Sequence, residues 1–187
     1  MPILSLEPQM FPSDLLEAGE RDSVDGRVWC ALHTRPRQEK SLARNLYAAQ
    51  VPFYLPLARR QTSSRNRTIN SYLPLFTGYV FLRANQDERV AALSSSRVVR
   101  SIAVADQQKL VRDLVQVYRL LQLGAPVAAE CRMVPGALVE IQYGPLAGLR
   151  GKIVQEAARK RFIVAVDFIQ RGVSVLLDGN SLVPIGA

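Results

Sequence analysis

One stretch of the sequence decides the fold: Leu75-Phe76-Thr77-Gly78-Tyr79-Val80-Phe81-Leu82. Its aromatic and β-branched residues predict a central strand. Alternation along that strand puts Tyr79 and Phe81 on one face and Phe76 with Val80 on the other, unless Gly78 marks a bulge that changes the facing. Two interpretations of the rings stay open. They fill the core of a sheet, or they line an exposed apolar pocket that receives a helical element of a partner.

Strands and helices alternate on both sides of this stretch. A strand is predicted for residues 28–32, and Thr34-Arg35-Pro36 predicts the start of a helix whose apolar face carries Leu42, Leu46 and Ala49. A short helix over residues 87–93, a strand over 98–104 and a longer helix from Asp106 follow. The alternation predicts an α+β fold, with an N-terminal α/β domain over residues 28–123.

The ends of that domain are predicted from changes in composition. Residues 1–27 contain prolines and acidic residues without a sustained apolar period, which predicts a mobile N-terminal extension. Residues 124–132 break the last helix with glycine and proline and predict a linker. Residues 133–187 hold short β-rich runs separated by turn signals, at 138–143, 151–155, 162–168 and 173–177. These closely spaced strands predict a small all-β barrel.

Charge is distributed unevenly along the chain. The protein carries a formal net charge of +8, yet residues 1–27 hold six of its 16 acidic residues and only two of its 24 basic ones. The rest of the chain is therefore strongly basic, and most of its bases are arginine, which favours a polyanionic partner. A basic surface that serves only solubility is the alternative. The nucleic-acid candidates lie in a polar segment and on or beside the exposed face of the first helix: Arg59, Arg60, Arg65, Arg67, Arg37, Lys40 and Arg44. For the polar segment, the other interpretation is a solvated hairpin tip.

Catalytic and cofactor chemistry finds no support in the motifs. The glycine-rich segment from Tyr143 to Lys152 lacks the spacing of a phosphate loop, so its glycines are interpreted as turn residues. His33 stands alone, and Cys30 and Cys131 lie a hundred residues apart. We expect no enzyme activity, no metal and no cofactor. No apolar run approaches the length of a membrane span, and we expect a cytoplasmic monomer with no membrane contact.

Four segments together resemble the NusG family of transcription elongation and antitermination factors, and the RfaH-like paralogues in particular. They are Val28-Trp29-Cys30-Ala31-Leu32, Pro52-Phe53-Tyr54-Leu55-Pro56, the stretch from Leu75 to Phe81, and the element from Pro135-Gly136 to Gly151, which looks like a KOW motif. The resemblance covers roughly residues 28–185. It implies a NusG-type N-terminal α/β sandwich followed by a small SH3-like KOW barrel. Thr77 departs from the family, which usually has proline there.

The resemblance also implies partners. The N-terminal domain is expected to dock through an apolar pocket on the clamp coiled coil of RNA polymerase, beside DNA of the elongation complex. The KOW domain is expected to recruit other factors, such as a ribosomal protein or a termination factor. Carried over by motif, the polymerase-binding candidates are Phe76, Tyr79, Phe81, Phe53 and Tyr54. The KOW turn and packing positions are Gly144, Leu146, Gly148 and Gly151.

Two further alternatives stay open at this point. A ribosome- or RNA-associated structural protein also contains small basic KOW-type barrels, but it would not need the preceding α/β domain. Some RfaH-like factors store the C-terminal domain as a helical hairpin, and Gln155–Arg161 is a helix-favouring segment. The β-branched runs on both sides of that segment favour the barrel, and the barrel is our prediction.

Overall fold

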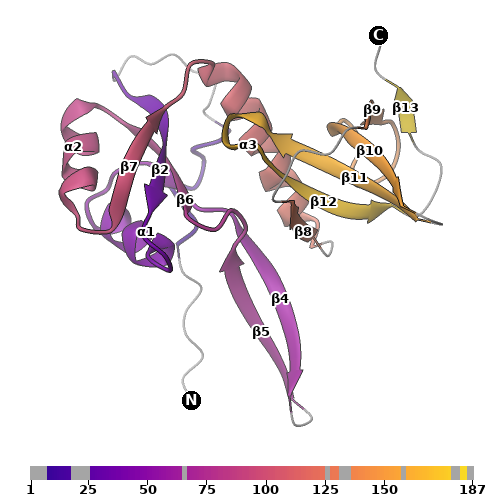
Figure 1. The fold of residues 1–187 in the computed structure, drawn as a ribbon, viewed down its shortest axis with the longest axis horizontal. Helices are drawn as coiled ribbons and strands as arrows, with labels where there is room; N and C mark the ends of the chain where they lie inside the picture. Colours follow the sequence, from indigo (N-terminus) through magenta and orange to yellow (C-terminus); the bar gives the residue numbers. More distant parts are fainter. Residues whose placement is uncertain are drawn as a thin grey trace. The chain divides into compact units, whose positions relative to one another are not determined.

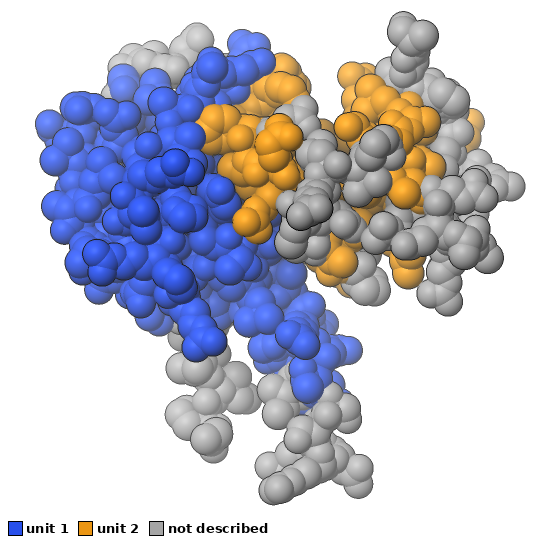
Figure 2. All heavy atoms as spheres, viewed as in Figure 1, with its two compact units in different colours: residues 1–108 blue, residues 109–187 orange. Residues whose placement is uncertain are grey.

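We describe the protein from a computed structural model, which covers residues 8–17, 26–64, 67–124, 127–130, 136–156, 159–177 and 182–184. Within them the chain clusters into two compact units, residues 1–108 and residues 109–187 (Figure 2). The fold is α+β, as the alternation of strand and helix patterns predicts. No helix among the described residues is both long and apolar enough to span a membrane.

The first unit is built on a five-stranded antiparallel sheet with the order β1-β3-β6-β2-β7 (Figure 1). Its strands are β1 (Met10–Phe11), β2 (Val28–Thr34), β3 (Phe53–Tyr54), β6 (Tyr79–Ala84) and β7 (Val98–Ala103). The predicted central strand, β6, lies between β3 and β2. Its residues are buried on both faces, which explains the nearly continuous aromatic and β-branched run.

Two helices cover one face of this sheet. Helix α1 (Glu39–Ala48) and helix α2 (Gln86–Ser94) bury small and aliphatic side chains against it. The resulting core cluster takes Cys30 and Leu32 from β2, and Val80 and Leu82 from β6. Because side chains alternate along a strand, Ala31, Tyr79 and Phe81 belong to the opposite face. Burial also raises the pKa of the Cys30 thiol, so this side chain remains neutral and behaves as an apolar residue.

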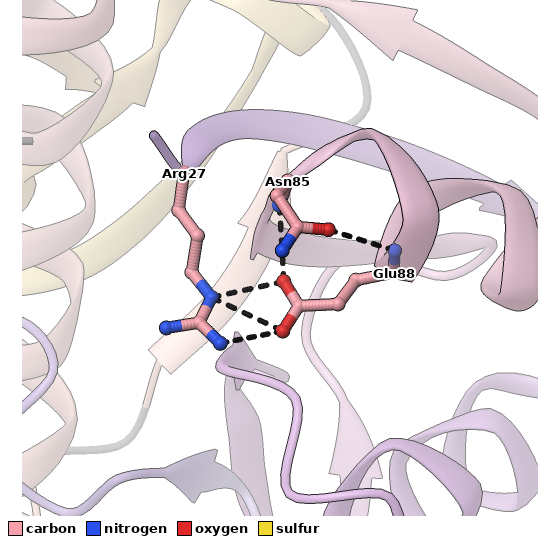
Figure 3. A network of polar contacts seen from close by, with 3 residues as sticks. All are labelled: Arg27, Asn85 and Glu88. Carbon is pink, nitrogen blue, oxygen red and sulfur yellow. Dashed lines mark hydrogen bonds and ion pairs between the residues drawn. The ribbon is translucent and has the colours of Figure 1, made fainter. Parts of the chain in front are cut away.

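The start of α2 is tied to the sheet by a polar network (Figure 3). The side chain of Asn85 accepts a hydrogen bond from the Glu88 backbone N–H at 2.9 Å, and a Glu88 carboxylate oxygen accepts one from the Asn85 backbone N–H at 3.0 Å. This reciprocal pair is a capping box. The same carboxylate pairs with the Arg27 guanidinium, whose Nη2 lies 2.5 Å from Oε1. One arginine beside β2 thus holds the first turn of a helix 61 residues further along the chain.

The N-terminal segment differs from the predicted mobile extension. Residues Met10–Phe11 pair with β3, and the Leu55 N–H donates to the Gln9 carbonyl at 2.6 Å. Phe11 packs edge-on against Tyr47, with ring centroids 5.5 Å apart, and Leu15 and Leu16 are only 2% and 5% exposed. Isolated apolar residues in an acidic segment carry no periodic signal, so composition alone missed them. Residues 1–7 and 18–25 of the predicted extension lie outside the described residues.

A second difference concerns the start of α1. The Thr34-Arg35-Pro36 signal predicts a helix from that point, but Thr34 ends β2 and the helix begins at Glu39. Arg37 has a positive φ of 62° in the intervening turn. Pro36 therefore lies in the connection between β2 and α1, and not in the first turn of the helix.

The β4–β5 hairpin leaves the first unit as a separate two-stranded sheet. Strands β4 (Leu57–Ser64) and β5 (Arg67–Pro74) pair along their whole length, and Figure 1 shows the hairpin extending away from the five-stranded sheet. The polar segment predicted to be an exposed hairpin or loop is this hairpin. Most of its described side chains are exposed.

The second unit contains most of helix α3 (Gln107–Gln122) and one six-stranded antiparallel sheet with the order β13-β9-β10-β11-β12-β8. In chain order its strands are β8 (Val127–Glu130), β9 (Ala137–Ile141), β10 (Arg150–Glu156), β11 (Arg159–Val166), β12 (Arg171–Leu177) and β13 (Leu182–Pro184), with a short 3₁₀ helix at Asp167–Ile169. Of the helix-favouring segment Gln155–Arg161, residues 155–156 lie in β10 and residues 159–161 lie in β11, as predicted for strands, and residues 157–158 lie outside the described residues.

The boundary between the units also departs from the predicted domains. The glycine and proline signals place a linker at residues 124–132, yet residues 127–130 form β8 and pair with β12. Contacts group α3 with the C-terminal strands, and the Arg150 backbone N–H donates to the Gln116 side chain at 2.7 Å. Glycine and proline therefore mark where the helix ends, but not where packing divides the chain.

Candidate functional site

The candidate polymerase-binding residues surround the turn that precedes β6. The Tyr79 N–H donates to the Phe76 carbonyl at 3.0 Å, and Gly78 has a φ of +84°. Among the described residues, Gly78 has a positive φ and Thr77 does not. A turn with a positive φ only at its third residue is a type II turn. A β-carbon at residue 78 would meet His33 Nε2 at 3.6 Å, an ordinary contact. The backbone conformation, and not crowding, favours glycine here.

Helix α1 and strand β2 hold this turn in place. A carboxylate oxygen of Glu39 accepts a hydrogen bond from the Gly78 N–H at 2.8 Å, and the Gly78 carbonyl accepts one from the Thr34 N–H at 2.9 Å. Glu39 is buried, and a buried carboxylate needs such a partner. Sequence reasoning missed Glu39, because nothing in a single acidic residue at a helix start indicates that it faces inward.

The turn also changes the facing of Phe76. Simple alternation groups Phe76 with Val80, but its ring contacts Phe81 edge-on, with centroids 6.1 Å apart and planes at 88°. The chain turns at Gly78, between the two rings. Phe76 therefore lies with Phe81 and not with Val80, as predicted for the case in which Gly78 interrupts the alternation. On the neighbouring strand, His33 packs against Tyr79 with centroids 5.4 Å apart. The lone histidine thus has a packing role beside the turn.

Burial separates the five aromatic candidates into two groups. Phe53, Tyr54, Phe76 and Phe81 are buried in the full chain, whereas Tyr79 is half-buried. The β-register puts Tyr54 opposite Phe81 and His33 opposite Tyr79, all on the sheet face that α1 and α2 leave uncovered. Phe53 instead joins the core cluster beneath the helices. In this structure only Tyr79 of the five offers part of its ring to a partner.

The described basic candidates come from different elements of the first unit. Arg59 and Arg60 are exposed on β4, and as consecutive strand residues they face opposite sides of the hairpin. Arg65 and the side chain of Arg67 lie outside the described part of the chain. Arg44 is exposed and Lys40 half-buried on α1, whereas Arg37 lies in the turn before it.

Tyr72 is an aromatic residue that the sequence motifs do not single out. It lies on β5, directly opposite Arg59, and its side chain is 38% exposed. The length of the first hairpin strand could have indicated this position. If the second strand pairs with the first along its whole length, it extends through Tyr72.

The glycine-rich turn of the second unit connects β9 to β10. Gly144 and Gly148 have φ of +88° and +81°, and the Gly148 N–H donates to the Ile141 carbonyl at 2.8 Å. Leu146 is half-buried between them. Gly151 lies in β10, where a β-carbon would clash with the backbone carbonyl oxygen of Ile163. Two of the glycines thus serve the turn and the third serves close strand packing.

Comparison with protein families gives one match. The profile described as "Transcription termination factor nusG" matches residues 27–135, more than half of the chain. The chain belongs to the NusG family. Its matched segment begins at the residue before β2 and includes the five-stranded sheet from β2 onward, the hairpin and α3, so β1 lies outside it. Members of the NusG family are transcription factors and not enzymes.

Thirteen chains of solved structures also match this NusG-family protein. One is from a study of domain interaction in Thermotoga maritima NusG, with a TM-score of 0.46 and 19% identity over 86% of this chain and 98% of that chain. Another is the MjSpt4:Spt5 complex in conformation B, with a TM-score of 0.31 and 15% identity over 86% of this chain and 98% of that chain. No curated protein matches the sequence. The functional assignment therefore rests on the family match.

Proposed function

We propose that the protein is a transcription elongation and antitermination factor that docks on RNA polymerase through the sheet face around Tyr79. Membership of the NusG family carries this proposal, because NusG proteins act in transcription and bind RNA polymerase. The docking surface on the polymerase is the clamp coiled coil, as the resemblance to RfaH-like factors implies.

Tyr79 makes the direct contact in this proposal. Its ring is half-buried and packs on His33, and the turn before it is held by Glu39 and Thr34. A ring held in this way loses little side-chain freedom when a helical partner covers it, and such anchors typically contribute about 2 kcal/mol or more to binding. Phe76 and Phe81 support the turn from the interior, and Tyr54 lies opposite Phe81 on the same face of the sheet. Phe53 supports that sheet from the other face, within the core cluster beneath the helices.

Basic side chains keep the factor close to DNA in the elongation complex. The exposed arginines of β4, together with Arg37, Lys40 and Arg44, contact phosphates without reading the base sequence. The same role is proposed for Arg65 and Arg67, whose side chains lie outside the described part of the chain.

The C-terminal unit recruits a second factor in our proposal. Its turn glycines are those of the KOW-like element, and its exposed apolar side chains include Leu138, Leu176 and Tyr143. We propose these exposed side chains as candidates for the contact with that factor. A ribosomal protein or a termination factor is the kind of partner that the family resemblance implies.

The test is capture of purified RNA polymerase by the full-length protein, with and without nuclease. We expect capture to survive nuclease treatment and to be lost in Tyr79→Ala, with an unfolding transition close to that of the wild type. Tyr143→Ala is the matched control, because it removes a ring that is 75% exposed in the other unit. Capture by the Tyr79 variant equal to wild type overturns the docking proposal, and capture that requires nucleic acid replaces it with simple bridging.

A further inference from the structure

The sheet face around Tyr79 continues across two more strands. The β-register pairs His33 of β2 with Tyr79 of β6 on one side and with Arg100 of β7 on the other. Residues directly opposite each other in an antiparallel pair lie on the same face of a sheet. Tyr79, His33 and Arg100 therefore form one row across three strands, which we call the Arg100 row. Neighbouring strands lie about 4.8 Å apart, so the row is about 10 Å wide.

A β-bulge in strand β7 puts Arg100 on this face. Thr34 is paired with Val98 and His33 with Arg100, so the register skips Val99. Val98 is buried in the core cluster beneath the helices, whereas Arg100 lies with His33 on the opposite face. Without the extra residue, alternation would direct the side chains at positions 98 and 100 to the same face. Bulges of this kind re-aim a side chain, often beside a functional site.

The Arg100 side chain is exposed, and it has no hydrogen-bond or ion-pair partner among the residues that the structure describes. Other arginines of the first unit are held by acceptors of the same chain. The Arg97 Nε donates to the Ser41 hydroxyl at 2.8 Å. The Arg59 Nε and Nη2 donate to Oδ1 of Asn70 at 3.2 and 3.1 Å. Arg100 thus offers its five N–H donors to a partner molecule.

Charge complementarity indicates what binds beside Arg100. Strands β2, β6 and β7 contain two arginines and no aspartate or glutamate. The second arginine, Arg83, is half-buried on β6, four residues along the strand from Tyr79. These strands therefore carry positive charge without an acidic residue of their own to neutralise it, which attracts a negatively charged group. A guanidinium binds carboxylates and phosphates through paired N–H donors.

The surroundings of Arg100 favour a carboxylate of a protein over the phosphates of a nucleic acid. The next row on the same face consists of Phe81, Ala31 and Ile102, which are all apolar. A nucleic acid is bound by several basic side chains along its backbone. A single arginine beside apolar side chains instead suits an amphipathic helix, whose apolar stripe lies next to charged residues. A helix with its side chains is about 10–12 Å in diameter, which matches the width of the Arg100 row.

We propose that Arg100 binds a carboxylate on the helix that docks over His33 and Tyr79, and that this contact selects the helix and its orientation. The inference rests on the proposed function, in which that helix belongs to the clamp coiled coil of RNA polymerase. Tyr79 supplies apolar contact area on one side of the helix, and Arg100 supplies a charge-assisted hydrogen bond on the other. Because a helix has carboxylates at only some positions, the arginine favours one register of its apolar stripe.

The experiment measures the affinity of the full-length protein for purified, nuclease-treated RNA polymerase. Arg100→Gln removes the charge, and we expect it to weaken binding about fivefold. Arg100→Glu brings like charges together, and we expect a loss of about thirtyfold or more. Arg89→Glu makes the same charge change on α2, which covers the opposite face of the sheet, and should bind like the wild type. The unfolding transitions of all three variants in urea should stay close to that of the wild type.

Charge reversal on the polymerase identifies the partner group. Each aspartate and glutamate of the clamp coiled coil is changed in turn to lysine, and each polymerase variant is tested with the wild-type protein and with Arg100→Glu. We expect one lysine variant to bind Arg100→Glu more tightly than unmodified polymerase does, and to bind the wild-type protein more weakly. This reciprocal change indicates a direct pair, because a general effect of charge would appear with every lysine variant.

Three results overturn this proposal. The first is wild-type affinity in Arg100→Gln and Arg100→Glu while Tyr79→Ala loses binding. The second is that no lysine variant of the coiled coil restores binding of Arg100→Glu. The third is a loss in Arg100→Gln that appears only when nucleic acid is present, which identifies a phosphate contact. The proposed function fails on a different observation, namely that the wild-type protein does not bind the polymerase or that Tyr79→Ala binds it equally well, and the inference then fails with it.

Discussion

The five-stranded sheet and the β4–β5 hairpin use the same residue types in opposite ways. In the sheet, Arg27 is paired with the carboxylate of Glu88, and Phe81 is buried. In the hairpin, Arg59 is held by a neutral amide, and Tyr72 is exposed. This comparison shows that the role of an arginine or an aromatic ring depends on its partner and its burial, and not on the residue type alone. Four sets of variants test this contrast, beginning with the largest expected effect.

Phe81→Ala should lower the free energy of unfolding by about 3–5 kcal/mol, because it leaves a cavity in the interior of the sheet. Tyr72→Ala in the hairpin should lower it by about 1 kcal/mol or less, since this side chain is already 38% exposed to solvent. Urea denaturation of both variants measures the difference. Equal losses would contradict the contrast between a buried and an exposed ring.

Glu39→Ala should lower the free energy of unfolding by about 1.5–3 kcal/mol, because the Gly78 N–H loses its charged acceptor. Glu39→Gln keeps an acceptor oxygen and should lose less. The comparison is again made by urea denaturation. If alanine and glutamine cost the same, the hydrogen bond to the turn is not what makes this carboxylate stabilising.

Glu88→Ala should lower the free energy of unfolding by about 1–2 kcal/mol, because it removes both a capping-box partner and the ion pair with Arg27. Arg59→Gln should change stability by about 0.5 kcal/mol or less, as expected for an exposed surface side chain. Thermal unfolding at low and high salt gives both values. A destabilised Arg59→Gln would mean that the hairpin arginine is structural after all.

Thr77→Pro should raise the free energy of unfolding by about 0.4–1 kcal/mol, because proline suits the second residue of a type II turn and restricts the unfolded chain. This is also the residue that the family usually has there. Gly78→Ala is the opposite control, since φ of +84° strains any residue with a β-carbon. Urea denaturation measures both variants. A loss of stability in Thr77→Pro would show that the turn needs the threonine N–H.

Periodicity predicted most of the regular structure. The apolar period after Asp106 predicted the helix that the structure has as α3, and the turn-separated runs predicted the C-terminal strands. Patterns of this kind are repeated over many residues, so one local exception does not obscure them. The α+β fold class followed from their order.

Features that depend on a single contact could not be predicted. The pairing of Met10–Phe11 with β3 and the facing of Phe76 each depend on one short segment. The grouping of Tyr72 with Arg59 depends on hairpin register, which the sequence of a polar segment specifies only weakly. Of the candidate site, the sequence therefore indicated the residue types and the region, while register and burial decided which side chains are exposed.

The short strand β1 has a consequence for how the protein behaves when it is shortened. By pairing with β3, it covers an edge of the sheet that residues 27–135 alone would leave with unsatisfied backbone N–H and C=O groups. A version trimmed to the family-matched segment would expose that edge together with the Phe11 contact surface on Tyr47. Such a fragment is at risk of self-association through strand pairing. Residues 8–17 therefore protect the first unit from aggregation at this edge.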